Sequence, residues 1–122
     1  RTGRPSMGWI TQKTSERVLV CRRLPARFDL SVEAYFPLCR MGRLAHQIRQ
    51  DMWRALQNLR GFMPIVEVTR ARDHLIVRAG GQLNCVAHIA FANERLCALL
   101  ADQDLRARWL RFAALKAEKK AC

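Results

Sequence analysis

The longest regular pattern of apolar residues lies between residues 38 and 60. Apolar side chains recur there three or four positions apart, at Met41, Leu44, Ala45, Ile48, Met52, Ala55, Leu56 and Leu59. On a helix these positions share one face, roughly 120° wide. Gly61 follows, and glycine most easily adopts the left-handed conformation that ends many helices. The pattern predicts an amphipathic helix over residues 38–60.

Two strands are predicted before this helix. Arg17–Leu24 is short and rich in β-branched residues, and Pro25 closes it because proline cannot donate to a ladder. Residues 28–36 alternate, with one face formed by Phe28, Leu30, Val32, Ala34 and Phe36. The alternative is a helix that starts at Ser31, but Phe36 precedes Pro37, and residues before proline avoid the helical region. We expect the two strands to form a hairpin.

Three strand-like runs follow the helix, at Met63–Thr69, His74–Ala79 and Leu83–Phe91. Their apolar residues share one buried face if Val68 pairs with Leu75 and Val77 with Cys85. The pair Gly80-Gly81 favours a tight turn, because glycine accepts positive φ without strain. The alternative is a single helix over residues 83–100. The strict alternation of residues 83–91 favours the strand.

Two helices are predicted at the end of the chain. Asn93 is a suitable N-cap for the first, and Asp102 marks either a second N-cap or a kink. The last helix has an apolar stripe and ends among lysines, at Leu105, Trp109, Phe112, Leu115, Lys116, Lys119 and Lys120. The complete order is β-β-α-β-β-β-α-α, which predicts an α+β fold with helices packed on one face of an antiparallel sheet. We expect residues 1–16 to form a loosely ordered lead, residues 17–119 one domain and residues 120–122 a tail.

Charge gives the clearest indication of a partner. The 122-residue chain carries 22 Lys and Arg residues against 10 Asp and Glu, a formal net charge of +12. Such a field attracts polyanions, so the expected partners are nucleic acid, an acidic protein or an anionic membrane surface. We rank membrane binding below the other two.

Cysteine usage and motifs narrow the class of protein further. The five cysteines are odd in number and form no C-x-x-C pair, so we expect reduced thiols in a cytoplasmic protein. No apolar run is long enough to cross a membrane. The acidic residues are scattered singly, and the sequence contains no catalytic or cofactor-binding motif, so neither an enzyme nor a cofactor is indicated.

A basic patch on the polar side of the predicted helix is the first candidate site. Its residues, together with two arginines of the first strand, are Arg22, Arg23, Arg43, Arg49, Trp53, Arg54 and Arg60. Cations around an exposed aromatic ring suit a phosphate backbone with a stacked base. The alternative is that Trp53 completes the rim of the core and the arginines form a solvated face.

The outer face of the predicted sheet is the second candidate site. Ile76 and Val86 form its apolar centre, flanked by Arg78, and such a patch suits a homodimer or an acidic protein partner. His74 and His88 come out as an opposed cross-strand pair that could bind a metal. No third ligand is evident, so the prediction is no metal.

Residues 38–100 have the predicted order α-β-β-β-α, which resembles that of double-stranded RNA-binding domains. Those domains open their second helix with a lysine-rich motif, where this chain has Asn93, Glu94 and Arg95, so no site residues carry over. The leading hypothesis is a nucleic-acid-binding or nucleic-acid-associated domain that contacts phosphates with little sequence specificity. An adaptor for an acidic protein is the second hypothesis, and a small enzyme with an unfamiliar site is the third.

Overall fold

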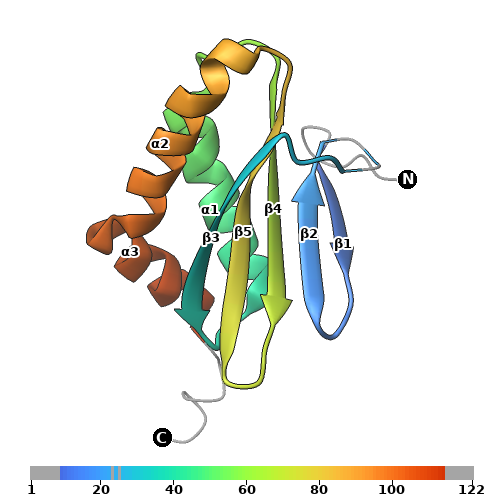
Figure 1. Ribbon diagram of the computed structural model, residues 1–122. Coiled ribbons are helices and arrows are strands. Elements are labelled where there is room, and N and C mark those ends of the chain that lie inside the picture. The colour runs from blue at the N-terminus through green and yellow to red at the C-terminus, as the bar shows by residue number, and fades with distance from the viewer. Residues whose placement is uncertain (1–8, 23, 25, 115–122) are drawn as a thin grey trace, which may run out of the picture.

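An antiparallel sheet with all its helices on one face forms the molecule (Figure 1). The computed structural model describes residues 9–114 except 23 and 25. The elements are β1 (Ile10–Lys13), β2 (Arg17–Cys21), β3 (Leu30–Pro37), α1 (Met41–Leu56), β4 (Phe62–Arg70), β5 (His74–Leu83), η2 (Val86–His88), α2 (Ile89–Ala101) and α3 (Gln103–Ala113). The sheet has five strands in the order β1-β2-β4-β5-β3. The predicted α+β class is confirmed.

Helix α1 occupies most of the predicted 38–60 segment and carries the core. Five of its apolar side chains are buried against the sheet, at Leu44, Ala45, Ile48, Met52 and Leu56. The helix ends earlier than predicted because the chain tightens after Leu56, whose carbonyl accepts a hydrogen bond from the Leu59 amide. Gly61 then takes the predicted left-handed conformation, with φ of 74°.

The prediction of a strand over Leu83–Phe91 is wrong. Strand β5 ends at Leu83, and the chain continues through η2 into α2. Helical spacing explains this outcome, because one face of α2 buries Ala92, Leu96 and Leu100 in the core. Cys85 and Phe91, which were expected to face the core, are exposed, and Asn93 lies inside the helix rather than at its cap.

The predicted turn at Gly80-Gly81 is also wrong, because both glycines lie inside β5. A Cβ atom on Gly80 would clash with the backbone of Leu30 and Ser31, and one on Gly81 would clash with the Met63 carbonyl oxygen. The glycines therefore allow β3 and β4 to approach β5 closely from its two sides. The register differs as well: Val68 pairs with Val77 rather than with Leu75. That shift of two residues keeps the same side chains on the buried face.

The first two predicted strands do not form a hairpin. Strand β2 pairs with β1 and β4, whereas β3 lies at the far edge beside β5. Strand β1 lies within residues 1–16, which were expected to be loosely ordered, and its sequence ITQK offers no apolar alternation to reveal it. Only two strands, β4 and β5, separate α1 from α2. The resemblance to double-stranded RNA-binding domains is therefore not supported.

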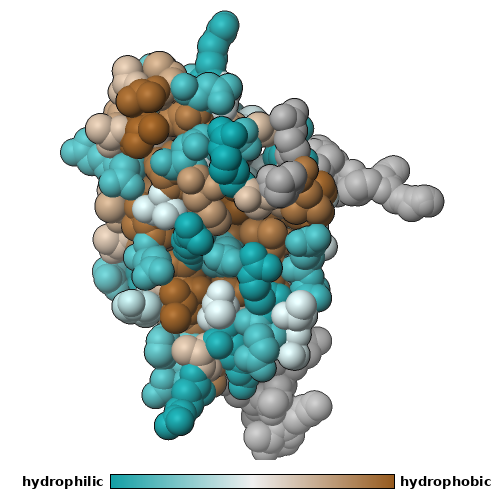
Figure 2. Space-filling view, turned by 45° about the vertical axis from the view of Figure 1, so that its right-hand side comes forward, coloured by the Kyte–Doolittle hydropathy of each residue, from teal (hydrophilic) through white to brown (hydrophobic). Residues whose placement is uncertain are grey.

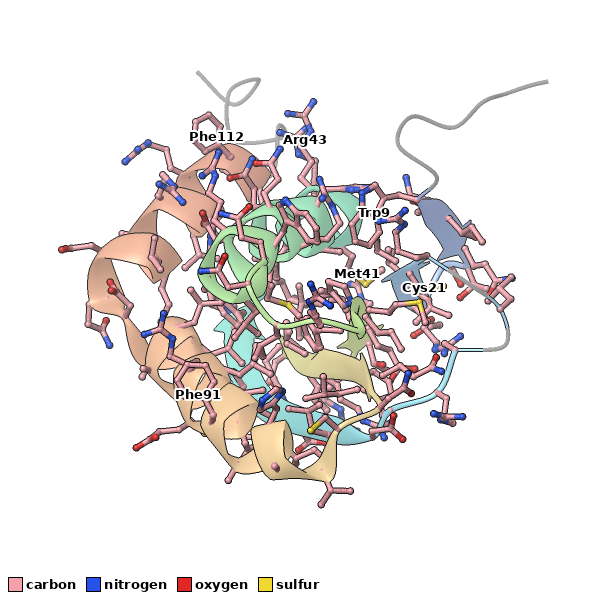
Figure 3. All side chains as sticks on the ribbon, turned by 90° about the horizontal axis from the view of Figure 1, so that it is seen from above. Trp9, Cys21, Met41, Arg43, Phe91 and Phe112 are labelled. Atoms are coloured by element: carbon pink, nitrogen blue, oxygen red, sulfur yellow. The ribbon has the colours of Figure 1, made fainter. Side chains whose placement is uncertain are left out.

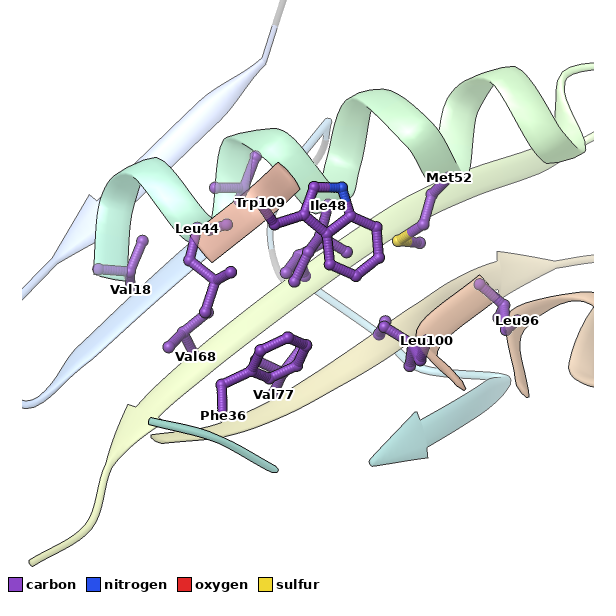
Figure 4. Close-up of a cluster of buried hydrophobic side chains, with 14 of the residues drawn as sticks. Val18, Phe36, Leu44, Ile48, Met52, Val68, Val77, Leu96, Leu100 and Trp109 are labelled. Atoms are coloured by element: carbon purple, nitrogen blue, oxygen red, sulfur yellow. The ribbon is translucent and has the colours of Figure 1, made fainter. Parts of the chain in front are cut away.

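Helix α3 closes the core from the side of α1. Of the two roles predicted for Asp102, the structure shows the N-cap: its carboxylate accepts hydrogen bonds from the amides of Asp104 and Leu105 at 2.9 and 3.0 Å. Trp109 is fully buried and packs against Phe36, with ring centroids 6.2 Å apart (Figure 4). The predicted lysine-rich end of this helix, from Leu115 onward, lies outside the described residues.

Candidate functional site

A groove runs between one flank of α1 and the β1–β2 hairpin. Helical spacing brings Gly42, His46, Arg49 and Trp53 onto this flank. The two sides touch at His46, whose Nε2 lies 3.5 Å from the Thr11 hydroxyl oxygen. We call this feature the α1–hairpin groove and define it by the residues that line its two hollows.

The larger hollow lies where α1 begins. It has a volume of about 690 Å³ and is lined by Lys13, Thr14, Val18, Arg40, Met41, Gly42, Arg43, His46 and Gln47. Three of these residues are formal cations, and none is acidic. A hollow of this size is within the usual range for ligand pockets. Its charge therefore suits an anionic ligand.

The smaller hollow lies further along α1 and is aromatic as well as basic. It has a volume of about 280 Å³ and is lined by Trp9, Arg22, Arg49 and Trp53. The guanidinium carbons of Arg49 and Arg22 lie 4.5 and 5.2 Å from the centre of the Trp9 ring. Figure 3 shows Trp9 between α1 and the hairpin, with Arg43 projecting further out from the helix. Trp53 is 41% exposed, so its indole is available to a ligand.

The positive charge of the groove is not neutralised within the described part of the chain. The five groove cations are Lys13, Arg22, Arg40, Arg43 and Arg49. Every ion pair between described residues lies elsewhere and uses Asp29, Asp51, Glu67 or Asp73 as its acidic partner. The Nε atoms of Arg40 and Arg49 are buried without a hydrogen-bond partner among the described residues. An anion entering the groove would therefore meet cations that are free to bind it.

The protonation of His46 reflects this excess of positive charge. Burial lowers the pKa of its imidazole below the ordinary value, and the nearby charges of Arg49 and Lys13 lower it further. Burial also lowers the pKa of the Arg49 guanidinium. At neutral pH, His46 is thus a neutral side chain inside a cationic groove.

The structure brings four of the predicted basic-patch residues together: Arg22, Arg43, Arg49 and Trp53 line the groove. Arg54 lies on the opposite flank of α1, where it donates to Asp51 at 3.1 Å. Arg60 is exposed in the turn after α1 and lines neither hollow, and Arg23 lies outside the described residues. Sequence reasoning missed Trp9 and Lys13, and it placed Arg40 on the polar side of the helix without including it in the candidate site. The first two depend on the hairpin, whose strand β1 has no apolar alternation.

The second predicted site is not assembled as expected. Ile76 and Arg78 lie on the outer face of the sheet, but Val86 lies on η2, beyond the end of β5, and is 79% exposed. His74 begins β5 and His88 follows its other end, so the predicted histidine pair does not form. No cluster of three metal-ligating side chains occurs among the described residues.

The outer face itself is mixed in character. Figure 2 shows hydrophilic and hydrophobic side chains interspersed over it, without one large apolar patch. Two of its arginines are paired, because Glu67 forms ion pairs with both Arg17 and Arg78. Arg78 also covers the Phe28 ring at 4.1 Å. These two arginines therefore have an acidic partner, unlike the cations that line the groove.

Comparison with models of protein families, with curated proteins and with solved structures finds no match. Within residues 9–114, no helix is both long enough and apolar enough to cross a bilayer. Any functional proposal must therefore come from the geometry and charge of the groove.

Proposed function

We propose that the protein binds nucleic acid through the α1–hairpin groove, mainly by contacts to phosphates and with little sequence specificity. The observation that carries the proposal is the set of five groove cations without an acidic partner in the described part of the chain. Arginine is four of the five, and its planar fork of donors suits phosphate oxygens.

The physical basis of binding is the release of counterions from the nucleic acid. Each phosphate that a cation neutralises frees condensed counterions, and this gain falls as the salt concentration rises. Because the contacts are to the backbone, affinity depends little on base sequence. A cytoplasmic location fits such a partner and stays a prediction.

The competing proposal of an acidic protein partner on the outer sheet face has less support. Glu67 already pairs Arg17 and Arg78 on that face, and Val86, which was expected at its apolar centre, lies on η2 instead. Assembly of a homodimer through Ile76 likewise stays a prediction. Sizing with light scattering of the Ile76→Arg variant tests it, because an interface centred on this residue would dissociate.

Removing groove arginines tests the nucleic-acid proposal. Arg43→Gln with Arg49→Gln removes two unpaired cations, and we expect it to weaken binding of a labelled oligonucleotide at low salt by roughly ten-fold or more. The matched control is Arg95→Gln with Arg111→Gln, which removes the same charge from exposed positions on α2 and α3. An equal loss in both double variants, or no binding by the wild type, contradicts the proposal.

A further inference from the structure

We infer that the ligand is single-stranded nucleic acid, with one base stacked on Trp53 in the smaller hollow and neighbouring phosphates held by the groove cations. This inference rests on the proposed function and adds the strandedness of the ligand and the position of a base. The starting observation is the exposed ring of Trp53, because contacts to phosphates alone would give this ring no role.

Trp53 is the most exposed of the three tryptophans. Trp109 is fully buried, whereas 41% of Trp53 remains exposed. An aromatic ring left open to water keeps apolar surface available for a partner. Since the ring lines the hollow beside Arg22 and Arg49, this place suits a partner that carries both a flat apolar group and negative charge. A nucleotide carries both.

The size and lining of the smaller hollow suit one base. Its volume of about 280 Å³ is near the lower end of ligand-binding pockets, roughly 300 Å³. The Trp9 ring is already in contact with Arg49, whose guanidinium carbon lies 4.5 Å from the ring centre. The exposed indole of Trp53 is therefore the surface on which a base can stack. A base on Trp53 would also meet the flat guanidinium groups, against which bases stack.

The rest of the groove suits a strand that continues from that base. Gly42 and Trp53 are separated by about 16 Å along the axis of α1, so the two hollows follow one another along a single helix flank. The larger hollow supplies Lys13, Arg40 and Arg43 for further phosphates. A single backbone can thus follow the groove while one of its bases enters the aromatic end.

A duplex satisfies this arrangement less well. Its bases are stacked inside the helix, and extruding one costs a few kcal/mol. A duplex would therefore offer phosphates to the groove and leave Trp53 without a partner. A single strand presents its bases freely, and stacking on an aromatic side chain is tolerant of sequence.

The test compares four ligands on three variants at one low salt concentration. The ligands are the 12-mers dT12 and rU12, a 12-base-pair duplex, and inorganic polyphosphate, which carries charge without bases. Trp53→Leu removes the ring and Trp53→Phe keeps an aromatic ring. Phe112→Leu is the matched control, because Phe112 is also exposed and lies 5.7 Å from an arginine, on α3 and outside the groove.

We expect the wild type to bind dT12 or rU12 more tightly than the duplex. Trp53→Leu should weaken single-strand binding on the order of ten-fold and leave polyphosphate binding unchanged. Trp53→Phe and Phe112→Leu should retain most of the affinity. A difference between dT12 and rU12 identifies the preferred sugar and supports the inference equally.

Two results overturn the inference while the proposed function stands: equal binding of duplex and single strand, or wild-type affinity of Trp53→Leu for both 12-mers. Failure of the wild type to bind polyphosphate and all three nucleic acids removes the proposed function as well. A second measurement covers the case in which Trp53→Leu does not fold. In a Trp9→Phe background, dT12 should quench the fluorescence of Trp53, and absence of quenching overturns the inference.

Discussion

Asp51 is the single buried charged residue among those that the structure describes, and it joins two helices. Its carboxylate accepts hydrogen bonds from the Trp109 indole nitrogen at 2.6 Å and from Arg54 at 3.1 Å, and also from Arg108. The two arginine side chains are partly exposed, so water screens their contribution. The buried indole N–H has no access to water and depends on Asp51.

Replacing Asp51 by alanine should destabilise the fold. The change leaves the buried indole donor of Trp109 unpaired, which costs about 2 kcal/mol in the free energy of unfolding. Urea unfolding followed by circular dichroism measures it. The exposed Glu94 on α2 supplies the control, since Glu94→Ala should stay within about 0.5 kcal/mol of the wild type. Equal effects of the two changes would show that the buried network contributes nothing.

His46 should make stability depend on pH. Its pKa in the folded protein is lowered from the ordinary value of 6.5, so the unfolded chain takes up the proton more readily than the folded one. The stability that this difference contributes is present above pH 6.5 and is lost as the pH falls from there through the lower folded pKa. Urea unfolding at a series of pH values across that window measures the effect. As the pH falls, the free energy of unfolding should decrease less in His46→Gln than in the wild type, whereas His88→Gln on η2 should follow the wild type. Identical curves for the wild type and His46→Gln would contradict this account.

At the scale of elements, the pairing of β5 with β3 and β4 depends on Gly80 and Gly81, where a side chain would meet the backbone of the neighbouring strand. Added Cβ atoms on Gly80 and Gly81 would meet backbone rather than flexible side chains, so neither strand can give way locally. By contrast, a Cβ on Gly42 in α1 meets the end of the Lys13 side chain, at 3.1 Å from its Cε atom. The same substitution therefore has different consequences in the two elements.

Gly80→Ala should destabilise the protein by about 2 kcal/mol or more, because β3 and β5 must move apart. Gly42→Ala should change stability by less than about 1 kcal/mol, since Lys13 can swing away and alanine favours helix. Thermal unfolding of the two variants compares them under one condition. Similar melting temperatures for Gly80→Ala and Gly42→Ala would show that β5 tolerates a side chain at position 80, which contradicts this account.

The hairpin of β1 and β2 forms the second wall of the α1–hairpin groove, opposite the basic flank of α1. It brings Trp9 and Lys13 opposite α1, where Trp9 faces Arg49 and Lys13 lines the larger hollow. Without it, α1 would present only a convex basic surface. Because β1 is four residues long and mostly exposed, hydrophobic patterning gives no signal for it.

At the scale of the whole molecule, the charge is unevenly distributed. Two acidic residues outside the groove each pair with two arginines: Glu67 on the outer face, and Asp51 between α1 and α3. The groove retains its cations unpaired within the described part of the chain. Five of the chain's 22 Lys and Arg residues are thus gathered along one groove.

The sequence predicts the parts of this arrangement that follow from local periodicity. Helical spacing correctly placed the core face of α1 and set Arg49 and Trp53 on one flank. The predicted strand over Leu83–Phe91 was wrong because alternating and helical patterns overlap in a short apolar segment. Trp9 was missed because its role depends on the pairing of β1 with β2, in which Ile10 lies opposite Cys21, and the sequence of β1 gives no pattern that predicts this strand.

The salt dependence of nucleic-acid binding tests the central claim most directly. If the five groove cations contact phosphates, the logarithm of the association constant should fall against the logarithm of salt concentration with a slope of about −3.5 for a single strand. Arg43→Gln with Arg49→Gln should reduce that slope by about 1.4. A slope near zero in the wild type, or one that the double variant leaves unchanged, contradicts the account.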